Sequence, residues 1–574
     1  MRNRQTLFDR ILVGAALIGA LLVLVLPTVN TGFLSDDLLD LHHEFSAESF
    51  TRFAFIGYRP LNEAVYAVDA RMWGAQKAWG WHITNILIHA VCAILFWRAA
   101  LHLSGSRRTA ALAVAFFLVS FATVPSFARV SGRTTPVAMA PLLGAVIMHS
   151  RWVSGRKVRD LILGLTLFLV SLFSKETALL CAPLFGMITV NLMRGEGSRT
   201  KAFFRVTALY LVPTALYLAL RFTWIGFAFG YADSARFGPF MLGNLLTLFR
   251  MSFSPWLDGI PLRILLILAA VVLFMARAPW RTRLMLVSLI VLPAVTMVNL
   301  PPRSYYAYAA LPGAALLFGM TAVSLRGWRG GVVVSVVLLG CLLSARDEVS
   351  RFLQADDYTS RMIVQLDSLN TSCPGDAFVF ISGIDYEVAD YSTLWPGAFI
   401  EALSTIGSDG SRLLEESSLW EVCWPVIELG GHPSCVFARI SETGFDTLHL
   451  DPSFRFQPQV PPDTLVSPVN GRIEITGRLL PMKSCSVPGT GRLLVSDPFD
   501  RESWIELQPF ESDGRTTVYD LESCAAWLLA DTSGSAWLLM PDGDGEIAFS
   551  GSRLWLEPLE EVLASKNGSF QQSH

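Results

Sequence analysis

The sequence has little charge for its length. Of its 574 residues, 16% are charged and 52% are hydrophobic, whereas a soluble globular chain has roughly 25% charged residues. The shortage of charge is concentrated before residue 346, which excludes an ordinary soluble enzyme for that part. The formal net charge is −3, a balance that does not indicate a nucleic-acid partner. The eight cysteines show no spacing typical of zinc ligands.

Residues 11–29 (ILVGAALIGALLVLVLPTV) contain no charge at all. A run of this kind is long enough to cross a bilayer, which takes about 20 apolar residues. Arg2, Arg4 and Arg10 precede it, as in a signal peptide. However, the run is too long for a signal peptide and no small-x-small cleavage site follows. We therefore expect a first span that stays in the protein.

Further apolar runs predict about eleven spans in total, and hence a polytopic α-helical membrane protein. They lie at residues 83–103, 109–124, 134–149, 160–173, 177–193, 206–222, 262–276, 284–300, 305–323 and 331–345. Basic clusters fall in alternate loops, at residues 107–108, 151–159, 194–205, 277–283 and 326–329. By the positive-inside rule, these loops and the N-terminus are cytoplasmic. We expect an integral plasma (inner) membrane protein whose C-terminal region is periplasmic or extracytoplasmic.

The composition changes after residue 345. Residues 346–372 combine apolar positions at helical spacing with charges elsewhere, which predicts a helical connector leaving the membrane. Residues 373–574 contain short β-like runs, at 377–381, 472–477, 492–496 and 536–540, separated by turn residues. The chain is thus expected to consist of a transmembrane domain (1–345), the connector and a β-rich soluble domain (373–574), without 34-residue helical repeats.

The cysteines divide in the same way. Cys92, Cys181 and Cys341 lie in predicted spans and are expected to be small packing residues. In the external domain, Cys423 and Cys435 are the first choice for a disulfide if that compartment is oxidising. The external cysteines are odd in number, so their pairing stays open.

Two adjacent carboxylates follow the first span, in the sequence Ser35-Asp36-Asp37. Ionisable groups at a membrane boundary are expensive to keep dry, which makes them candidates for function. The alternative is that they are simply the first solvated residues after a helix. The predicted topology places them in an external loop, on the same side as the loops that carry Arg133, Lys175 and Arg303.

Three polar residues share nearly one face of the second span, namely His82, Asn85 and His89. Polar side chains in a bilayer face a cavity or another helix. We name all three as candidate substrate-binding residues. The alternative, interhelical hydrogen bonding, is a common use of such residues. A metal site fits the spacing but lacks an obvious third ligand.

The other external turns supply further candidates for substrate binding. These are Arg59 in the first loop, Arg133 in Ser131-Gly132-Arg133, the pair Lys175 and Glu176, and Arg303 with Tyr305. A guanidinium holds phosphate in a bidentate fork, so arginines at the outer surface suit a lipid phosphate. An interfacial anchor for Arg303 and a packing role for the Lys-Glu pair are the alternatives.

In order, the external motifs read SDD, YRPL, WG, GWHxTNxLxHA, SGR, SKETAL and RSYYAYAALPGAALL. This series resembles the membrane half of the transmembrane, TPR-containing O-mannosyltransferases and their prokaryotic relatives, within the GT-C glycosyltransferase superfamily. The resemblance covers about residues 30–320. It implies an enzyme that moves a sugar from a polyprenyl-phosphate carrier, with Asp36 and Asp37 as catalytic carboxylates. The chain departs from the family where residues 122–129 lack a His-Pro, where residues 134–135 are Thr-Thr instead of acidic, and where the TPR array is absent.

The expected reaction is transfer of a hexose from a lipid-phosphate donor to a hydroxyl of a protein or glycan acceptor at the external face of the bilayer. Asp36 is favoured as the base because it lies closer to the membrane, and arginines would hold the leaving phosphate. A phosphate held by arginines needs no metal, so transfer without metal is predicted, although paired Asp would also suit Mg²⁺ or Mn²⁺. A transporter or flippase, and an inactive glycan-binding scaffold, are the alternatives.

Overall fold

The chain forms two compact units in a computed structural model. The structure describes residues 11, 14–38, 59–193, 198–225, 240–253, 278–296, 298, 304–325, 327–375, 377–389, 391–394, 398–415, 435–441 and 444–449, and beyond them individual strands up to residue 558. The first unit, here called the helical unit, comprises residues 1–359 and 387–394. The second, the sheet unit, comprises residues 360–386 and 395–574.

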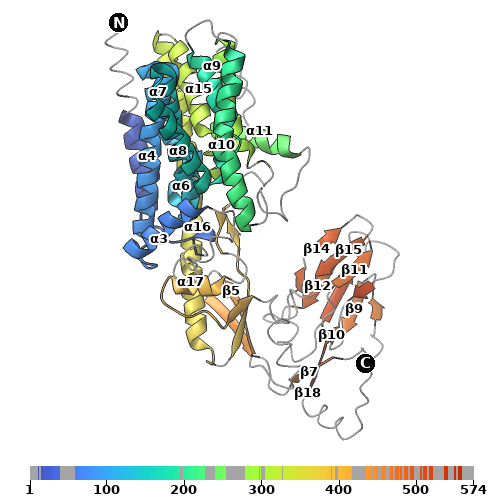
Figure 1. Ribbon diagram of the computed structural model, residues 1–574. Helices are drawn as coiled ribbons and strands as arrows, with labels where there is room; N and C mark the ends of the chain where they lie inside the picture. Colours follow the sequence, from blue (N-terminus) through green and yellow to red (C-terminus); the bar gives the residue numbers. More distant parts are fainter. Residues whose placement is uncertain are drawn as a thin grey trace. The chain divides into compact units, whose positions relative to one another are not determined.

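The helical unit is a bundle of helices joined mostly by short turns (Figure 1). Its described α-helices are α3 (Pro60–Trp73), α4 (Ala78–Ser104), α5 (Arg107–Val119), α6 (Val124–Ala128), α7 (Thr134–Gly155), α8 (Val158–Ser174), α9 (Ala182–Leu192), α10 (Arg199–Ile225), α11 (Phe240–Phe253), α13 (Trp280–Val295), α14 (Ser304–Ala307), α15 (Leu311–Ser324) and the first part of α16 (Gly327–Ser372). Short 3-10 turns η3 (Phe121–Thr123), η4 (Ser131–Arg133) and η5 (Glu176–Ala178) interrupt the bundle.

The helices make this a multi-pass membrane protein. Within the described residues, three helices are long and apolar enough to cross a membrane, at 78–104, 131–155 and 199–223. A fourth candidate is the pair 107–119 and 121–128, which is bent by 65°. Other predicted spans coincide with shorter apolar helices, at 14–28, 182–192 and 311–324, and the predicted span 262–276 lies outside the described residues. The multi-pass helical class is therefore confirmed, whereas the number eleven stays a prediction.

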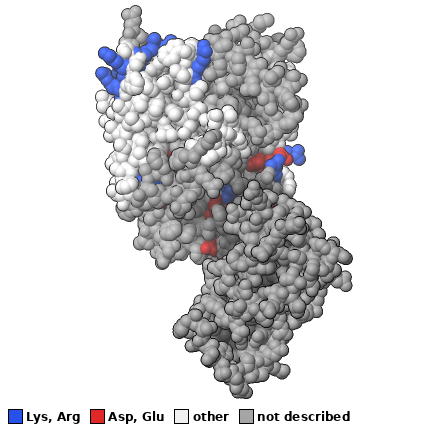
Figure 2. Space-filling model, turned by 90° about the vertical axis from the view of Figure 1, so that its right-hand side faces the viewer, with Lys and Arg blue, Asp and Glu red and all other residues white. Residues whose placement is uncertain are grey.

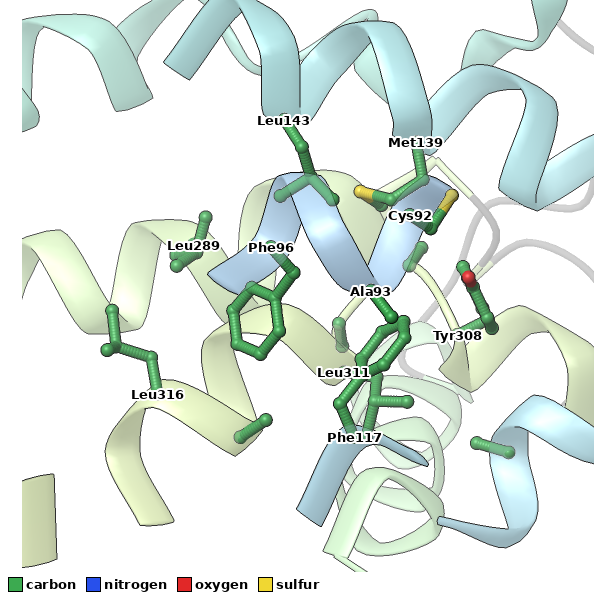
Figure 3. Close-up of a cluster of buried hydrophobic side chains, with 14 of the residues drawn as sticks. Cys92, Ala93, Phe96, Phe117, Met139, Leu143, Leu289, Tyr308, Leu311 and Leu316 are labelled. Carbon is green, nitrogen blue, oxygen red and sulfur yellow. The ribbon is translucent and has the colours of Figure 1, made fainter. Parts of the chain in front are cut away.

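The interior of the bundle is built by small and aromatic residues from helices distant in sequence. Figure 3 shows Phe96 of α4, Phe117 of α5 and Leu311 of α15 meeting in one apolar cluster. A Cβ on Gly319 would lie 2.5 Å from the carbonyl oxygen of Thr109, so only glycine permits this approach of α15 to α5. Small residues at contacts of this kind let membrane helices approach closely. Cys92, like Cys181 and Cys341, is buried in this packing, as predicted.

Successive helices run in alternate directions, which determines where their ends meet. Helix α4 has 27 residues and is therefore about 40 Å long. One end of the bundle contains the first turn of α4, residues 120–133 before α7, and the turn after α8. The turns at residues 105–107 and 156–157 lie at the other. Figure 2 shows Lys and Arg side chains gathered at one end of this unit, next to a broad band without charge among its coloured atoms.

The sheet unit contains the strands that the sequence predicts. The four runs predicted as strands form β1 (Phe378–Ser382), β9 (Arg472–Thr476), β12 (Arg492–Ser496) and β16 (Ala536–Met540). Strand β1 pairs in parallel with β4 (Leu413–Glu415) and β5 (Cys435–Ser441), and β6 (Gly444–His449) pairs antiparallel with β5. Further on, a five-stranded sheet has the order β13-β12-β16-β9-β8, with β13 at Trp504–Glu506 and β8 at Val466–Val469. The β-rich character of the region is confirmed.

The sheet unit contains two more sheets, and the long helix α16 contributes its last part to this unit. The order is β14-β15-β11-β17 in one sheet and β10-β18-β7 in the other. Their bounds are β14 Pro509–Ser512, β15 Thr516–Asp520, β11 Ser484–Pro488, β17 Ala548–Ser550, β10 Leu479–Leu480, β18 Leu554–Pro558 and β7 Phe454–Pro458. Helix α16 runs unbroken through residues 346–372, so the predicted connector and the last predicted span share one helix. Cys423 lies outside the described residues.

Candidate active site

The two neighbouring acids occupy opposite environments. Asp37 is completely buried. Its Oδ1 accepts a hydrogen bond from the backbone N–H of Ser131 at 2.6 Å, and its Oδ2 accepts from those of Val130 at 3.1 Å and Leu34 at 3.3 Å. A carboxylate held by three backbone amides is fixed in place. Asp37 therefore ties residues 34–37, here called the acid loop, to the turn before α7.

Asp36 instead leaves 44% of its side chain exposed and forms an ion pair with Arg129, whose Nη2 lies 3.2 Å from Oδ2. Arg129 is itself buried. Burial by itself would lower the pKa of its guanidinium, but the carboxylates of Asp36 and Asp37 outweigh burial and raise that pKa. Arg129 thus stays charged, and the Asp36 carboxylate is the member of the pair that water and substrate can reach.

Local backbone geometry explains why the two acids point apart. Ser35 adopts a positive φ of 46°, a region that costs a non-glycine residue roughly 1–2 kcal/mol. Its N–H donates to the carbonyl oxygen of Thr393 at 3.0 Å. On the facing turn, a Cβ on Gly132 would lie 1.8 Å from the carbonyl oxygen of Pro125. Glycine at that place allows the SGR turn to fold back and aim its amides at Asp37.

Arg133 lies in a closed pair with Asp69 of α3. The guanidinium bonds to the Asp69 carboxylate and lies over the rings of Tyr66 and Trp81, with 4.9 and 5.3 Å from Cζ to the ring centroids. Both charged side chains are buried, with exposures of 0% and 2%. The role as a phosphate ligand predicted for Arg133 has no support in these contacts, which pin α3 to the start of α7.

The polar stripe of α4 bonds to neighbouring segments. The Nε2 of His82 lies 3.1 Å from the carbonyl oxygens of both Thr31 and Gly32. Asn85 donates from Nδ2 to the carbonyl oxygen of Arg129 at 2.6 Å. The Nδ1 of His89 lies 3.1 Å from the hydroxyl of Tyr308.

All three polar side chains of this stripe are buried. Their contacts favour the interhelical alternative over substrate binding. His82 and Asn85 nevertheless matter for the site, because they hold the segments that carry the acids and Arg129.

A second charged cluster forms around Glu176. Arg59 donates to its Oε2 from Nε at 3.1 Å and from Nη2 at 3.0 Å. Arg221 of α10 donates from Nη1 to its Oε1 at 2.7 Å and to the hydroxyl of Tyr217 at 2.8 Å. Burial would raise the pKa of the Glu176 carboxyl, but Arg59 and Arg221 together lower it to about 2. Glu176 is therefore a permanent anion between two cations.

Lys175 lies beside this cluster, in the turn between α8 and α9. Its Nζ donates to the hydroxyls of Thr134 at 3.1 Å and Thr135 at 2.9 Å. Burial, and then the positive charge of Arg59, lower the pKa of this amine to about 7, although Glu176 acts in the opposite direction. Two arginines thus pair with the Glu176 carboxylate, and the amine of Lys175 lies on two threonine hydroxyls beside them, so the local excess of positive charge suits an anion.

Two adjacent tyrosines connect the acid–arginine pair with the cationic cluster. The Cζ of Arg129 lies 5.9 Å from the ring centroid of Tyr305, and the Nζ of Lys175 lies 5.7 Å from that of Tyr306. The centroids of the Tyr305 and Tyr306 rings are 4.3 Å apart, and the rings meet edge to face. Asp36, Arg129 and Lys175 therefore adjoin the same pair of tyrosines, and this set of residues is here called the patch. Arg303, expected to bind phosphate in the same turn, lies outside the described residues.

A divalent metal at the acid pair fits the residues poorly. Mg²⁺ and Mn²⁺ take carboxylate oxygens, but both oxygens of Asp37 already accept backbone N–H groups. Asp36 would then be a lone carboxylate ligand, with the Arg129 cation beside it. Across the described part of the chain, no group of three His, Cys, Asp or Glu side chains is arranged to hold an ion.

Sequence reasoning passed over three functional partners, namely Asp69, Arg129 and Arg221. Arg221 carried a usable signal, because it is a charge at the end of the apolar run 206–222 and such charges are rarely without a partner. Arg129 stands next to SGR, close to the predicted motif. Asp69 lies on an amphipathic helix where a solvated charge is ordinary, so no pattern singled it out.

The fold and the patch define a class of protein, a multi-pass membrane protein with a charged site at one end of its helices. No protein-family model matches the chain. Over 203 residues it is 29% identical to Protein O-mannosyl-transferase Tmtc1 of Drosophila melanogaster, a stretch that is 32% of this chain and 24% of that protein. The chain thus spans about a quarter of that relative. The resemblance to transmembrane O-mannosyltransferases predicted from the ordered motifs is confirmed over this stretch.

Two solved structures are distantly similar to this chain. ArnT from Cupriavidus metallidurans bound to undecaprenyl phosphate has 13% identity and a TM-score of 0.43, over 75% of this chain and 92% of that one. The Archaeoglobus fulgidus oligosaccharyltransferase has 10% identity and a TM-score of 0.44, over 96% of this chain and 98% of that one. Both likenesses are distant.

Proposed function

We propose that this protein is a membrane glycosyltransferase that moves a sugar from a polyprenyl-phosphate carrier to an acceptor hydroxyl at the external face of the membrane. The observation that carries the proposal is the exposed Asp36 carboxylate, ion-paired with buried Arg129 in one patch with the Lys175 cluster. Such a patch offers a base for the hydroxyl and cations for the phosphate that leaves, which are the two needs of this reaction.

Asp36 takes the role of general base, and Asp37 that of its anchor. The Asp36 side chain is open to an incoming hydroxyl, whereas both Asp37 oxygens are occupied. Arg129 orients the Asp36 carboxylate through the ion pair between its Nη2 and Oδ2. In the reaction, the carboxylate would accept the proton of the hydroxyl as its oxygen attacks the anomeric carbon and the bond to the phosphate oxygen breaks.

The phosphate is assigned to the cationic cluster of Lys175, Arg59 and Arg221. Their charge exceeds that of Glu176, so an arriving phosphodiester would complete the balance of a buried group. Its lipid tail would lie along the apolar helices, while the C-terminal unit on the external side would contribute to acceptor choice. The cytoplasmic placement of the N-terminus and of the basic loops belongs to this proposal.

The test is complementation of a strain that lacks the gene, with the cell's glycans profiled. Asp36→Asn should leave the glycans unrestored at normal amounts of protein in the membrane. Asp347→Asn is a matched control, because it breaks an exposed Asp–Arg pair of 3.1 Å with Arg351 elsewhere in the unit. The control should restore the glycans fully. Restoration by Asp36→Asn would overturn the proposal.

A further inference from the structure

One short segment of the chain lies in the helical unit while its neighbours in sequence belong to the sheet unit. Residues 387–394, here called the strap, group with residues 1–359, whereas residues 360–386 and 395–574 form the other unit. The strap contains the hairpin of β2 (Glu387–Val388) and β3 (Tyr391–Ser392). A detour of this kind requires specific contacts to hold it.

The first contact is made directly to the acid loop. The carbonyl oxygen of Thr393 accepts a hydrogen bond from the backbone N–H of Ser35 at 3.0 Å. Thr393 is fully buried and Leu394 nearly so. Ser35 is the residue with the positive φ of 46°, and it directly precedes Asp36. A backbone in this region persists only when its surroundings hold it there.

The second contact runs through Glu348 of α16. The hydroxyl of Tyr391 donates to its Oε1 at 2.9 Å, and the hydroxyl of Ser304 donates to the same oxygen at 3.1 Å. The ring of Tyr391 also packs edge to face on Phe352, with 5.5 Å between the centroids. Ser304 begins α14, which carries the tyrosines beside Arg129 and Lys175. The Glu348 carboxylate therefore ties the strap to α14, here called the tyrosine turn.

Both contacts converge on the groups assigned to the reaction. Thr393 of the strap holds the residue before Asp36. Tyr391 is linked through Glu348 and Ser304 to the helix that carries Tyr305, whose ring lies by Arg129. Movement of the strap would therefore change the direction of the Asp36 carboxylate and its distance from the guanidinium. Misplacement of a catalytic group by about 1 Å can cost 100-fold in rate.

We propose that the strap is a positioning element of the active site, in which Tyr391 and the Thr393 carbonyl hold the acid loop so that Asp36 faces the acceptor hydroxyl. Tyr391 acts through Glu348 and the tyrosine turn and does not itself contact the substrate. This inference rests on the proposed function. It makes residues that are remote from the acids in sequence necessary for the rate of transfer.

The test compares Tyr391→Phe with Tyr210→Phe in the full-length protein, using a polyprenyl-phosphate sugar as donor and washed membranes as acceptor. Each variant removes one buried hydroxyl that is hydrogen-bonded, in the control to His149 at 3.2 Å near the other end of the bundle. Tyr391→Phe should lower kcat about 10- to 100-fold with the donor KM unchanged, while its melting temperature falls by an amount similar to that in Tyr210→Phe, which also loses a buried hydrogen bond. Tyr210→Phe should leave kcat unchanged. Equal kcat in the two variants would overturn the positioning role.

A second set of variants tests whether Tyr391 acts through Glu348. Glu348→Gln keeps an oxygen that accepts from Tyr391 and should retain most of the rate, whereas Glu348→Ala should lose as much as Tyr391→Phe. The double variant Tyr391→Phe with Glu348→Ala should be no slower than the slower single one, because both changes break the same link. Additive losses would refute the link.

Failure of this inference can be told from failure of the proposed function. If Asp36→Asn abolishes transfer while Tyr391→Phe is as fast as the unmodified protein, only the strap proposal falls. If Asp36→Asn transfers sugar normally, the proposed function falls first, and the strap has no base to position.

Discussion

Arg129 joins Asp36 to the rest of the bundle through two different groups. Its guanidinium lies 3.2 Å from the carboxylate of Asp36, while its backbone carbonyl accepts the side-chain N–H of Asn85 at 2.6 Å. Asn85 of helix α4 thereby fixes the backbone of Arg129. The side chain of Arg129 in turn orients Asp36, the proposed base. A polar residue of a membrane span contributes to the site in this way without contact with a ligand.

Replacement of Arg129 tests this relationship. Arg129→Gln should lower kcat about 10- to 100-fold, because the Asp36 carboxylate loses the cation that orients it. Arg129→Lys should keep part of the rate, since a charge returns without the planar fork. The measurement is initial rate against donor concentration, with Arg351→Gln as the control for loss of an exposed Asp–Arg pair. An unchanged kcat in Arg129→Gln would contradict the assignment.

Asp37→Asn should chiefly destabilise the protein. The amide group keeps one acceptor oxygen and turns an NH₂ towards backbone N–H groups, so a buried set of three hydrogen bonds is disrupted. We expect a loss of about 2 kcal/mol or more in the free energy of unfolding, seen as a lower melting temperature in detergent. Asp36→Asn replaces a half-exposed carboxylate and keeps an acceptor oxygen for Arg129, so it should lower the free energy of unfolding by less than Asp37→Asn does. Equal melting temperatures for the two variants would argue against the anchor role.

Ser35→Gly should make the protein more stable. Glycine adopts a φ of 46° without steric cost, and the change removes a buried hydroxyl for which the described residues provide no hydrogen-bond partner. Against this, glycine raises the entropy of the unfolded chain. We expect a net gain of about 1 kcal/mol, measured as a higher melting temperature. Ser35→Ala removes the hydroxyl but not the strain, and it should gain less. A lower melting temperature in the glycine variant would disprove strain at this residue.

The lowered pKa of Lys175 predicts that the free energy of unfolding depends on pH. Burial, and then Arg59, lower the pKa of its amine from 10.5 to about 7 in the folded protein. Between these two values the unfolded chain holds a proton that the folded chain lacks. The free energy of unfolding should therefore rise with pH from about 7 to 10.5 and be lowest below 7. Lys175→Met should lack this rise, measured by melting at several pH values.

The same titration should affect donor binding. A phosphodiester donor stays anionic throughout, so the KM should rise above pH 7 as Lys175 loses its proton. Lys175→Arg, with a charge that does not titrate in this range, should keep a KM that is flat between pH 7 and 9. A donor KM in the unmodified protein that is flat across this range would remove Lys175 from the phosphate site.

Much of the architecture could be predicted from the chain because it depends on local pattern. The apolar runs that the structure describes became helices, the β-like runs became β1, β9, β12 and β16, and the buried cysteines were recognised from their apolar surroundings. Two of the motifs predicted to be external lie together, since Arg59 and Glu176 are in contact across 117 residues of sequence, while the side of the membrane stays a prediction.

The roles of individual polar residues were not readable in the same way. Arg133 was expected to bind phosphate, yet it is enclosed by Asp69 and two aromatic rings. The stripe of α4 was a candidate for substrate, yet its partners are other segments of the protein. In both cases the residue type and its topological side were right for either role. Only the neighbour in space distinguishes them, and that neighbour is 50 or more residues away in sequence for His82 and Arg133.

Asp36 and Asp37 give the sharpest example. Composition, order of motifs and topology predict both acids at the outer end of the first span, and these follow from hydrophobicity and charge along the chain. At that level the two acids differ only in that Asp36 lies one position closer to the membrane. What separates them is the folded environment, in which three backbone amides enclose one carboxylate and a single arginine approaches the other. Burial and hydrogen bonding arise only when distant segments pack, so the choice between anchor and base belongs to the tertiary structure.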